Sequence, residues 1–396
     1  MDKQHYKIGL VLSQPPGYSE TFFQSKIKGL IAQGMEVALY CQKGDDDFKL
    51  CPVIISPAVS RNPIIQGFYF LKVYLQLLLH LRAVLKYVQL ELKSGTTIFQ
   101  LFKQVYLNSH LLSAKLDWLH FGFATQALGS ETVAKAIGAK MAVSFRGFDI
   151  AVYPRKHPGC YKKLWKYVDK VHTISTYLLR EAYSLGLSKN TPFERITPAV
   201  NLDLIHSESR MEVAASEEIQ IVTIARLHYI KGIDLLIEAA SLLKQKSLKF
   251  SWKVIGGGTK EYQERYQYHI YEKGLQKEVL LTGKLSHKET LKLLTSANLY
   301  VQPSLNEGFC NAVLEAQAMG TLTIASNTGG LPENIVDGKT GWLFESQSAE
   351  SLARQIEWVL ALNVTEKSQI STDAMKRVRE VFNIEKQQRE FFGFYL

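Results

Sequence analysis

The pattern that most constrains the fold is an alternation of strand-like and helix-like runs in the C-terminal half of this 396-residue chain. Short apolar runs alternate with longer amphipathic runs, in the order strand 219–225, helix 233–244, strand 250–255, helix 260–272, strand 279–281, helix 287–296, strand 297–303, a helix-like run that ends at Gly320 and strand 322–325. An alternation of this kind is typical of βαβ units, whose strands run in the same direction. The sequence therefore predicts a parallel sheet covered by helices.

The N-terminal half shows a similar alternation. Residues 6–12 form a strand-like run that ends at Pro15-Pro16-Gly17, an amphipathic run follows to about residue 33, and residues 35–41 are predicted to form the next strand. A strand, a helix and a second strand in this order favour a right-handed βαβ unit. The loop at Gly17 lacks the G-x-G-x-x-G pattern of dinucleotide-binding folds, so Gly17 is only a weak candidate for a ligand-binding position.

A polar, acidic stretch without hydrophobic periodicity separates the two alternations at residues 207–218. We interpret it as a linker at 206–217, between an N-terminal Rossmann-like domain at 1–205 and a C-terminal one that begins at 218. The chain is long enough for two domains of ordinary size, each with its own core. Two α/β units joined in this way are expected to face each other across a cleft.

Cations and glycines follow the strand ends of the C-terminal half. Arg226 and Lys231 flank the loop after strand 219–225, and Gly257 lies in a run of three glycines after strand 250–255. Open α/β sheets bind ligands at the carboxyl ends of their strands, and two cations beside a helix N-terminus suit a diphosphate. Gly257 leaves room for the backbone to approach a ligand closely.

The segment 307–315 adds two carboxylates to these strand ends. It joins strand 297–303 to the next helix through a loop that contains a glycine, so backbone N–H groups and a positive helix end would face an anion there. A ligand that is half sugar and half phosphate suits this combination. Alternatively, the two acids only favour the helix N-terminus, by ~0.3–1 kcal/mol each. The candidate ligand contacts are Glu307, Gly308, Phe309, Asn311 and Glu315.

Polar residues also follow strands in the N-terminal half. His120 lies in the strand-like run 117–122, and Arg146 and Asp149 follow the strand 141–145. Polar side chains at the ends of two strands favour a role for these residues in the ligand cleft. A single histidine on a strand is more often a core residue whose hydrogen bonds are satisfied, and both interpretations of His120 stay open.

The positive charge is concentrated in the N-terminal half. Residues 1–200 carry 25 Lys and Arg against 13 Asp and Glu, a net charge of +12 within a chain total of +10. Within this half, residues 64–93 are the most apolar segment, but polar side chains recur through it and argue against a transmembrane span. Two interpretations remain. One is a helix packed on the sheet with a basic outer face, and the other is a helix or helical hairpin on an anionic inner leaflet.

The basic and aromatic segment 153–170 also has two interpretations. Interleaved cations and rings bind single-stranded nucleic acid in some proteins, but a solvated helix face with a buried aromatic side is the commoner origin of this pattern. We expect no secretory leader, because the first strand-like run lacks a small-residue cleavage site, and the four cysteines show neither paired nor metal-ligand spacing. We therefore expect a cytoplasmic protein, with the inner face of the cell membrane as a further expected location, and no metal site.

With these pieces assembled, the C-terminal half resembles the retaining nucleotide-sugar glycosyltransferases of family 4, which have the two-domain GT-B fold. Weaker similarities to the family lie at 19–22, 117–120 and 144–149. The end of the chain, 381–396, looks like the family's last helix, which crosses back to the first domain. The resemblance covers 218–345 and rests on Arg226 with Lys231-Gly232, the strand at 253–258, the two glutamates eight residues apart, Gly329-Gly330-Leu331-Pro332-Glu333, and Asp337-Gly338 with Gly341.

The resemblance implies an acceptor-side domain at 1–205 and a nucleotide-sugar-binding domain at 218–380. Arg226 and Lys231 would hold the donor diphosphate without a metal, Glu307 would contact the donor sugar and Glu315 the ribose hydroxyls. No cofactor is expected beyond the nucleotide sugar as co-substrate. The implied acceptor is a saccharide or lipid-linked saccharide in cell-surface polysaccharide synthesis. We expect peripheral association with an anionic membrane and no binding of nucleic acid.

The chain departs from the family pattern in its first domain. Where the family often has His-x-His, this chain has His120 and Gly122, and Arg146 stands where the family often has histidine. Either His120 or Arg146 supplies the missing contact to the sugar, or a different sugar needs none. Epimerases and phosphorylases with the same architecture are alternative activities. A non-catalytic sugar-binding or nucleic-acid-binding protein is the alternative from another class.

Overall fold

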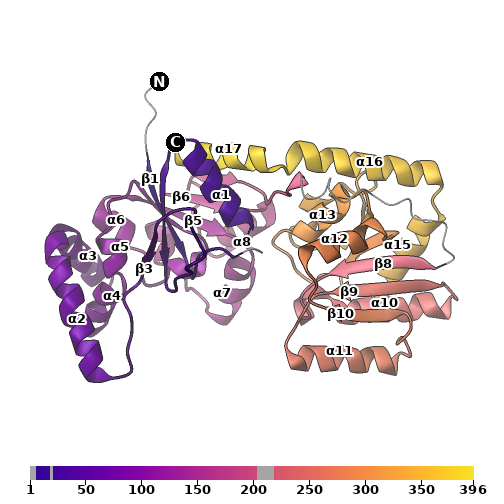
Figure 1. The fold of residues 1–396 in the computed structure, drawn as a ribbon, viewed down its shortest axis with the longest axis horizontal. Helices are drawn as coiled ribbons and strands as arrows, with labels where there is room; N and C mark the ends of the chain where they lie inside the picture. Colours follow the sequence, from indigo (N-terminus) through magenta and orange to yellow (C-terminus); the bar gives the residue numbers. More distant parts are fainter. Residues whose placement is uncertain (1–5, 18–20, 203–217) are drawn as a thin grey trace. The chain divides into compact units, whose positions relative to one another are not determined.

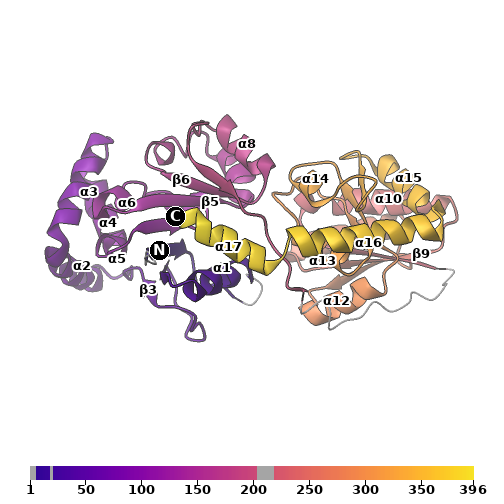
Figure 2. The ribbon, with the colours of Figure 1, turned by 90° about the horizontal axis from the view of Figure 1, so that it is seen from above.

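The computed structural model describes residues 6–17, 21–202 and 218–396, which divide into two compact units (Figures 1 and 2). The first unit comprises residues 1–197 and 387–396, and the second comprises residues 198–386. The predicted linker at 206–217 lies outside the described residues, as do the first two residues of the motif at 19–22.

The first unit is built on a seven-stranded sheet with the order β3-β2-β1-β4-β5-β6-β7, and each pair of neighbouring strands is parallel. The central strands β4 and β5 are almost entirely buried, which is usual for a parallel sheet with helices on both faces. The strands are β1 (Lys7–Leu12), β2 (Glu36–Cys41), β3 (Val53–Ile55), β4 (Trp118–Phe121), β5 (Lys140–Phe145), β6 (Lys170–Thr173) and β7 (Phe193–Arg195).

The helices of the first unit alternate with these strands and include several short turns. They are α1 (Thr21–Ala32), α2 (Pro63–Leu77), η1 (Leu78–His80), α3 (Leu81–Lys93), α4 (Ile98–Leu107), α5 (Ser109–Leu112), η2 (Ala124–Ala127), α6 (Val133–Ile137), η3 (Phe148–Val152), α7 (Tyr153–Lys156), η4 (Leu164–Lys166) and α8 (Thr176–Ser184).

The second unit has a six-stranded parallel sheet with the order β10-β9-β8-β11-β12-β13. Its strands are β8 (Ile219–Ile224), β9 (Phe250–Ile255), β10 (Val279–Gly283), β11 (Leu299–Gln302), β12 (Leu322–Ser326) and β13 (Trp342–Phe344). Its helices are η5 (Tyr229–Lys231), α10 (Ile233–Gln245), α11 (Lys260–Glu272), α12 (His287–Thr295), α13 (Asn311–Ala318), α14 (Leu331–Asn334), α15 (Ala349–Ala361) and α16 (Val364–Val381). Two parallel sheets with helical connections confirm the predicted α/β class.

The last helix, α17 (Ile384–Tyr395), returns to the first unit, as the sequence predicts. Its amide Gln388 Nε2 donates a hydrogen bond to the Ser25 carbonyl oxygen on α1, at 3.2 Å. Near the end of the chain, the Tyr395 carbonyl oxygen accepts a hydrogen bond from the indole Nε1 of Trp118 on β4, at 3.1 Å. Phe391, Phe394 and Tyr395 are fully buried in the same core as β1 and α1, so α17 is part of the first unit's core.

Helices α2 and α3 lie at the outer margin of the first unit in both views (Figures 1 and 2). α2 packs mainly on α4 and α5, where the rings of Phe70 and Tyr106 are 4.3 Å apart and those of Tyr74 and Phe102 are 4.8 Å apart. A helix lying on the sheet, one of the two sequence interpretations, is therefore not what the chain forms. By length and composition the run 63–93 is apolar enough to span a membrane, and only 6% of its most apolar window is buried.

Candidate active site

The carboxyl ends of the strands in the second unit bring Lys231 and Glu307 into contact. Lys231 ends the turn η5 after β8, and its ammonium group donates a hydrogen bond to the Glu307 carboxylate in the loop after β11. Ser304 Oγ donates to the same carboxylate oxygen at 3.0 Å. Both side chains are mostly buried but keep some exposed surface. The cation and the acid predicted from separate motifs thus form one site.

The position of Glu307 depends on the Gly329-Gly330 turn. Gly330 N–H donates to the Glu307 carbonyl oxygen at 2.7 Å, and a Cβ atom at Gly330 would lie only 2.1 Å from the carbonyl oxygen of Gly308. Gly329 has φ near 56°, and a Cβ atom there would lie 2.3 Å from the carbonyl oxygen of Glu307. Any side chain at Gly330 would push the loop away. The Gly-Gly-Leu-Pro-Glu segment therefore acts by holding the loop that carries Glu307.

Helix α13 begins at Asn311, directly after this loop, and Glu315 lies one turn into it. The loop and helix start are fixed by two hydrogen bonds with the buried Asn334: Cys310 N–H donates to its Oδ1 at 3.1 Å, and its Nδ2 donates to the Cys310 carbonyl oxygen at 3.0 Å. The N-terminus of α13 thus points its positive dipole end at the strand-end edge of the sheet. Phe309 is buried and packs against Phe382, so its backbone, rather than its ring, is available to a ligand.

Glu315 pairs with His287 at the start of α12. The two side chains approach to 3.2 Å between His287 Nε2 and Glu315 Oε1, and both are partly exposed. The hydrogen bond to Glu315 raises the pKa of His287 from its ordinary value. His287 was not among the residues that the sequence pattern singled out. A half-buried carboxylate with a cationic partner has acceptor capacity left for ligand hydroxyl groups.

Arg226 and Gly257 lie at neighbouring strand ends, after β8 and β9. The Arg226 side chain is exposed, and its neighbour Leu227 donates its N–H to the Gly257 carbonyl oxygen at 2.8 Å. Gly256 has φ near 148°, and a Cβ there would meet the Ala225 carbonyl oxygen at 2.1 Å. The two loops are therefore held tightly together beside the Lys231 site, with Arg226 projecting from them.

The structure corrects the expectation that His120 faces the cleft. Its side chain has no exposed surface and lies in the core of the first unit. Tyr395 OH donates to His120 Nδ1 at 2.6 Å, and His120 Nε2 donates to Ser144 Oγ at 2.8 Å. Lys26 Nζ is 3.2 Å from the same Nδ1 atom. A fully enclosed imidazole with these partners has no access to a sugar.

The donor and acceptor roles in this cluster follow from one backbone carbonyl. The Ile196 carbonyl oxygen can only accept, so His172 Nε2 carries the proton of their 2.9 Å hydrogen bond and His172 Nδ1 accepts from Ser144 Oγ at 2.8 Å. Both imidazoles are then neutral. Burial, with Lys26 as the next cause, lowers the pKa of both His120 and His172 far below the ordinary value, in agreement with this assignment.

Arg146 lies over aromatic rings of the first unit. Its guanidinium carbon is 3.9 Å from the ring centre of Phe22 and 4.6 Å from that of Phe23, so it forms cation–π contacts. The neighbouring Asp149 is buried and accepts the N–H groups of Arg146, Gly147 and Ala124, which fixes the loop after β5. Arg146 is partly exposed, so of the two first-domain candidates it alone retains access to solvent.

The hydrogen bonds of Gly17 and of two rings in the segment 153–170 are made within the protein. The Gly17 carbonyl oxygen accepts a hydrogen bond from Gln24 Nε2 at 3.2 Å in the loop after β1. In the basic and aromatic segment, Tyr161 is buried and donates to the Asp149 carbonyl oxygen at 2.6 Å, and Trp165 Nε1 donates to the Leu185 carbonyl oxygen at 3.0 Å. These rings face the protein interior, which favours the structural interpretation of the segment over nucleic-acid binding.

Comparison with known proteins supports the family suggested by these motifs. Residues 206–377 match the model of the glycosyl transferases group 1 family. The chain is 27% identical to a putative colanic acid biosynthesis glycosyltransferase of Escherichia coli K12 in an alignment of 281 residues, which covers 68% of each protein. It is 27% identical over 255 residues to the amylovoran biosynthesis glycosyltransferase of Erwinia amylovora, which covers 62% of this chain and 61% of the relative. Residues 206–377 belong to the group 1 glycosyltransferases.

Solved structures of this family's architecture resemble the whole glycosyltransferase chain. A glycosyltransferase from Rickettsia africae superposes with a TM-score of 0.71 at 20% identity, covering 99% of this chain and 98% of the other. The Anabaena protein HepE, solved in complex with UDP and glucose, superposes with a TM-score of 0.71 at 14% identity, covering 98% of each chain. At these identities the likeness shows the fold, and it confirms the predicted GT-B fold.

A cavity of about 780 Å³ lies at the carboxyl ends of β1, β2 and β3 in the first unit of the glycosyltransferase. Leu12, Cys41 and Ile55, the last residues of these strands, line it. Within the described residues, the buried amide oxygens Gln104 Oε1 and Gln126 Oε1 in its wall have no hydrogen-bond partner. No local pattern marked these glutamines, because only the tertiary fold brings α4 and η2 to the strand ends.

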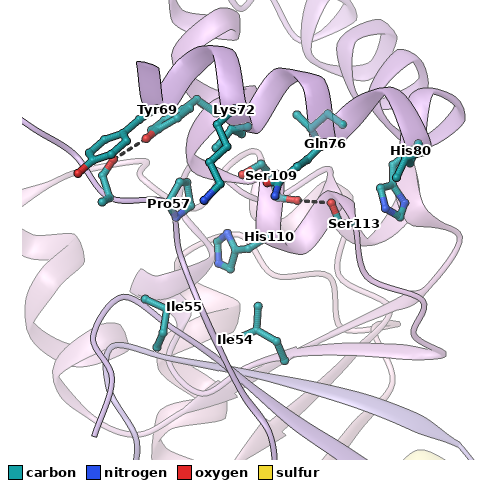
Figure 3. A pocket seen from close by; sticks show the side chains of 15 residues that line it. Ile54, Ile55, Pro57, Tyr69, Lys72, Gln76, His80, Ser109, His110 and Ser113 are labelled. Carbon is teal, nitrogen blue, oxygen red and sulfur yellow. Dashed lines mark hydrogen bonds between the residues drawn. The ribbon is translucent and has the colours of Figure 1, made fainter. Parts of the chain in front are cut away.

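A second cavity of about 620 Å³ adjoins the first one beneath α2 (Figure 3). The two cavities share Ile55, Pro57, Ala58 and His110 as lining residues. Lys72, Gln76 and His80 reach it from the helical run above, and His110 faces it from below (Figure 3). The first unit therefore has two adjoining recesses, one at the strand ends and one beneath α2.

Proposed function

We propose that this glycosyltransferase moves a hexose-like sugar, with retention of anomeric configuration and without a metal ion, from a nucleotide sugar to a saccharide or lipid-linked acceptor in cell-surface polysaccharide synthesis. The observation that carries the proposal is the contact between Lys231 and Glu307 beside the N-terminus of α13. It combines a cation for a diphosphate with a carboxylate for a sugar at the strand-end edge of one sheet.

The donor end of the proposal is supported by charge. As the bond from the anomeric carbon to the phosphate oxygen breaks, negative charge grows on the leaving nucleoside diphosphate and positive charge on the sugar ring. Lys231, Arg226 and the N–H groups at the start of α13 would stabilise the first, and the Glu307 carboxylate would stabilise the second. Glu315 would accept hydrogen bonds from the ribose hydroxyl groups. HepE, a fold neighbour, was solved with UDP-glucose, which makes a uridine nucleotide the first donor to test.

The acceptor end is supported by the cavity at the ends of β1, β2 and β3. Gln104 and Gln126 turn amide oxygens toward it, and sugar hydroxyl groups are donors that would satisfy such oxygens. The sequence relatives act, by their names, in the biosynthesis of colanic acid and amylovoran. A growing polysaccharide or its lipid-linked precursor is therefore the acceptor class that we propose.

Binding of nucleotides to the purified protein tests the donor proposal. Isothermal calorimetry with UDP, GDP, ADP and their glucose derivatives should give saturable binding of one base that is unchanged by EDTA. Lys231→Ala should weaken that binding at least about tenfold, because it removes a charge-assisted contact to the diphosphate. Lys260→Ala, an exposed lysine on α11, is the matched control and should bind as the wild type does. Failure to bind any nucleotide would overturn the proposal.

The stereochemistry of transfer tests the reaction class. With the nucleotide sugar that binds, NMR of the product or of the hydrolysed sugar should show the anomeric configuration of the donor. Inversion at the anomeric carbon would exclude a retaining transferase. Release of an epimerised sugar, or consumption of inorganic phosphate with the sugar, would indicate one of the alternative activities of this architecture.

A further inference from the structure

The helical run α2–η1–α3 carries large apolar side chains that face solvent. Four of them recur on α2 at spacings of four, three and four residues, which places them along one side of the helix, and a fifth, Leu79, follows in η1. We call this set the apolar ridge: Ile64, Phe68, Leu71, Leu75 and Leu79. Each is more than half exposed, and Leu79 reaches 86%. Soluble monomers rarely leave a contiguous apolar stripe of this size open to water.

The opposite face of α2 explains why the ridge points outward. Phe70 and Tyr74 pack against Phe102 and Tyr106 of α4, and Tyr74 OH donates to the Phe102 carbonyl oxygen at 2.7 Å. Asn62 caps the start of α2 through its side-chain oxygen, and Pro63 follows at the first position of the helix. The helix is therefore anchored in one rotational setting, and the ridge is held on its free side.

Helix α3 carries exposed leucines and cations in adjacent rows. Leu81, Leu85 and Leu92 are about half exposed or more. An exposed cation follows each of these leucines in the sequence. Adjacent residues are about 100° apart around a helix, so the cations form a row beside the leucines. We call these cations the basic row: Arg82, Lys86 and Lys93.

All the exposed formal charges on this part of the chain are positive. Residues 59–107 contain six Lys and Arg, all exposed, and one acid, Glu91. Glu91 is fully buried and accepts hydrogen bonds from Lys163 Nζ, both at 2.7 Å. Burial works to raise the pKa of Glu91, but the hydrogen bonds from Lys163, Thr132 and Thr96 prevail and lower it. The charge of the surface therefore complements an anionic partner without any opposing acid.

We propose that the apolar ridge and the basic row dock the acceptor-side unit on the surface of an anionic lipid bilayer, with α2 and α3 lying in the plane of the interface. Apolar side chains enter the acyl boundary while lysine and arginine meet lipid phosphates, which is how amphipathic interfacial helices bind. The ring contacts of α2 with α4 oppose insertion across the bilayer, because crossing would separate them. The cavity beneath α2 then opens beside the lipid headgroups (Figure 3).

Vesicle sedimentation with the full-length protein tests this docking without any sugar chemistry. The wild type should pellet with vesicles of 70% phosphatidylcholine and 30% phosphatidylglycerol, and much less with phosphatidylcholine alone. Pelleting should fall as NaCl rises from 50 to 500 mM, because cation–phosphate attraction is screened. Equal pelleting with both vesicles, or none with either, would overturn the proposal.

Two variants separate the apolar and the electrostatic contributions. Phe68→Ser with Leu71→Ser, Leu75→Ser and Leu79→Ser should reduce the partition coefficient at least about 100-fold, because four exposed apolar groups are lost. Arg82→Gln with Lys86→Gln and Lys93→Gln should reduce it about 100-fold, at about fivefold for each cation near the surface. Because these side chains are exposed, both variants should keep the wild-type circular dichroism and Tm.

Matched controls remove the same chemistry elsewhere. Tyr268→Ser with Tyr271→Ser removes exposed apolar groups from α11, and Lys156→Gln with Lys162→Gln and Lys189→Gln removes three exposed cations from the first unit. Both should bind vesicles within about twofold of the wild type. If the cation control loses binding as the basic row does, net charge rather than this surface is responsible and the proposal fails.

Two other occupants of the surface give different results. A second copy of the chain would appear as a dimer in analytical ultracentrifugation that the four-serine variant dissociates, with no vesicle binding. A bilayer-spanning helix would resist extraction of the vesicle pellet by sodium carbonate at pH 11 and by 1 M NaCl. Either result would overturn docking in the plane of the interface. Nucleotide binding in solution is measured without vesicles, so it can fail or succeed independently.

Discussion

The two units of this glycosyltransferase contain similar polar groups in opposite environments. In the first unit, His120, His172 and Lys26 lie in the core with little or no exposed surface. In the second unit, His287 with Glu315 and Lys231 with Glu307 lie at the strand ends and keep part of their surface exposed. A buried polar cluster must be satisfied internally and specifies packing, whereas a partly exposed one has capacity left for a ligand. The same residue types therefore indicate fold in one unit and chemistry in the other.

The largest effect that would sharpen this comparison is expected at Glu307. Glu307→Gln keeps the size of the side chain but removes the charge that we propose faces the sugar. We expect the rate of transfer to fall about 10²–10³-fold, which is typical for loss of one electrostatic contact to the transition state. Initial rates of nucleotide release measure it. Glu264→Gln on α11 should leave the rate unchanged, and an active Glu307→Gln enzyme would place the chemistry elsewhere.

His120→Ala tests the other side of the comparison. The change opens a cavity and leaves Tyr395, Ser144 and Lys26 without their shared partner, so the free energy of unfolding should fall by about 3 kcal/mol. Urea denaturation measures this loss. At a temperature where the variant is folded, its transfer rate should stay within about threefold of the wild type. His157→Ala, an exposed histidine, is the control for stability. A stable but inactive His120→Ala protein would restore a catalytic role to His120.

Gly330→Ala tests the loop contact that positions Glu307. Its φ is near −89°, which any residue adopts, so the cost of a side chain is steric rather than conformational. The methyl group would clash with the Gly308 carbonyl oxygen, and the loop would have to shift to remove the clash. We expect this shift to lower the free energy of unfolding by about 1–3 kcal/mol and to lower the affinity for nucleotide. Denaturation and calorimetry measure both. Gly67→Ala on α2, where a Cβ has open space, should be neutral or stabilising.

The pH dependence of stability should differ in sign between the two histidine sites. His120 and His172 have lowered pKa values in the folded chain, so below pH ~6.5 the unfolded chain binds more protons and stability falls. Each contributes a slope of up to about 1.4 kcal/mol per pH unit. His287 has a raised pKa, so its contribution is present below pH ~6.5 and is lost as pH rises through the folded value. Hydrogen exchange at β4 and α12 between pH 5 and 8 measures the stability near each histidine site. The same pH dependence at both sites would contradict the predicted difference in sign.

The smallest effect is expected in the titration of His287 itself. Glu315→Gln removes the main cause of the raised pKa, so the His287 pKa should fall toward the ordinary value near 6.5. The imidazole NMR signal followed against pH measures it. Binding of nucleotide should also shift this titration if the ribose contacts Glu315. A His287 signal insensitive to both changes would separate this pair from the donor site.

Much of the fold and of the second unit's site could be predicted from the sequence because the information is local. Lys231 follows its strand within a few residues, Glu307 precedes its helix, and glycines mark the turns that bring them together. Parallel strands share one edge of a sheet for their carboxyl ends, so local order is enough to gather these residues. His287 was not predicted because it lies at the start of another helix, and only the tertiary structure places its side chain beside Glu315.

The sequence by itself thus determined the α/β class, the resemblance to a glycosyltransferase family and the residues that lie at the strand ends of the second unit, since each rests on periodicity or short motifs. Only the tertiary structure determined that His120 is buried and that large apolar side chains of the run 63–93 are exposed. His120 is enclosed because α17 arrives from 275 residues further along the chain and covers it with Tyr395. The ridge of α2 is left uncovered by the chain because α4 occupies the other face of the helix. Contacts between distant segments cannot be read from local periodicity, and they determine which polar groups are buried and which apolar groups remain exposed.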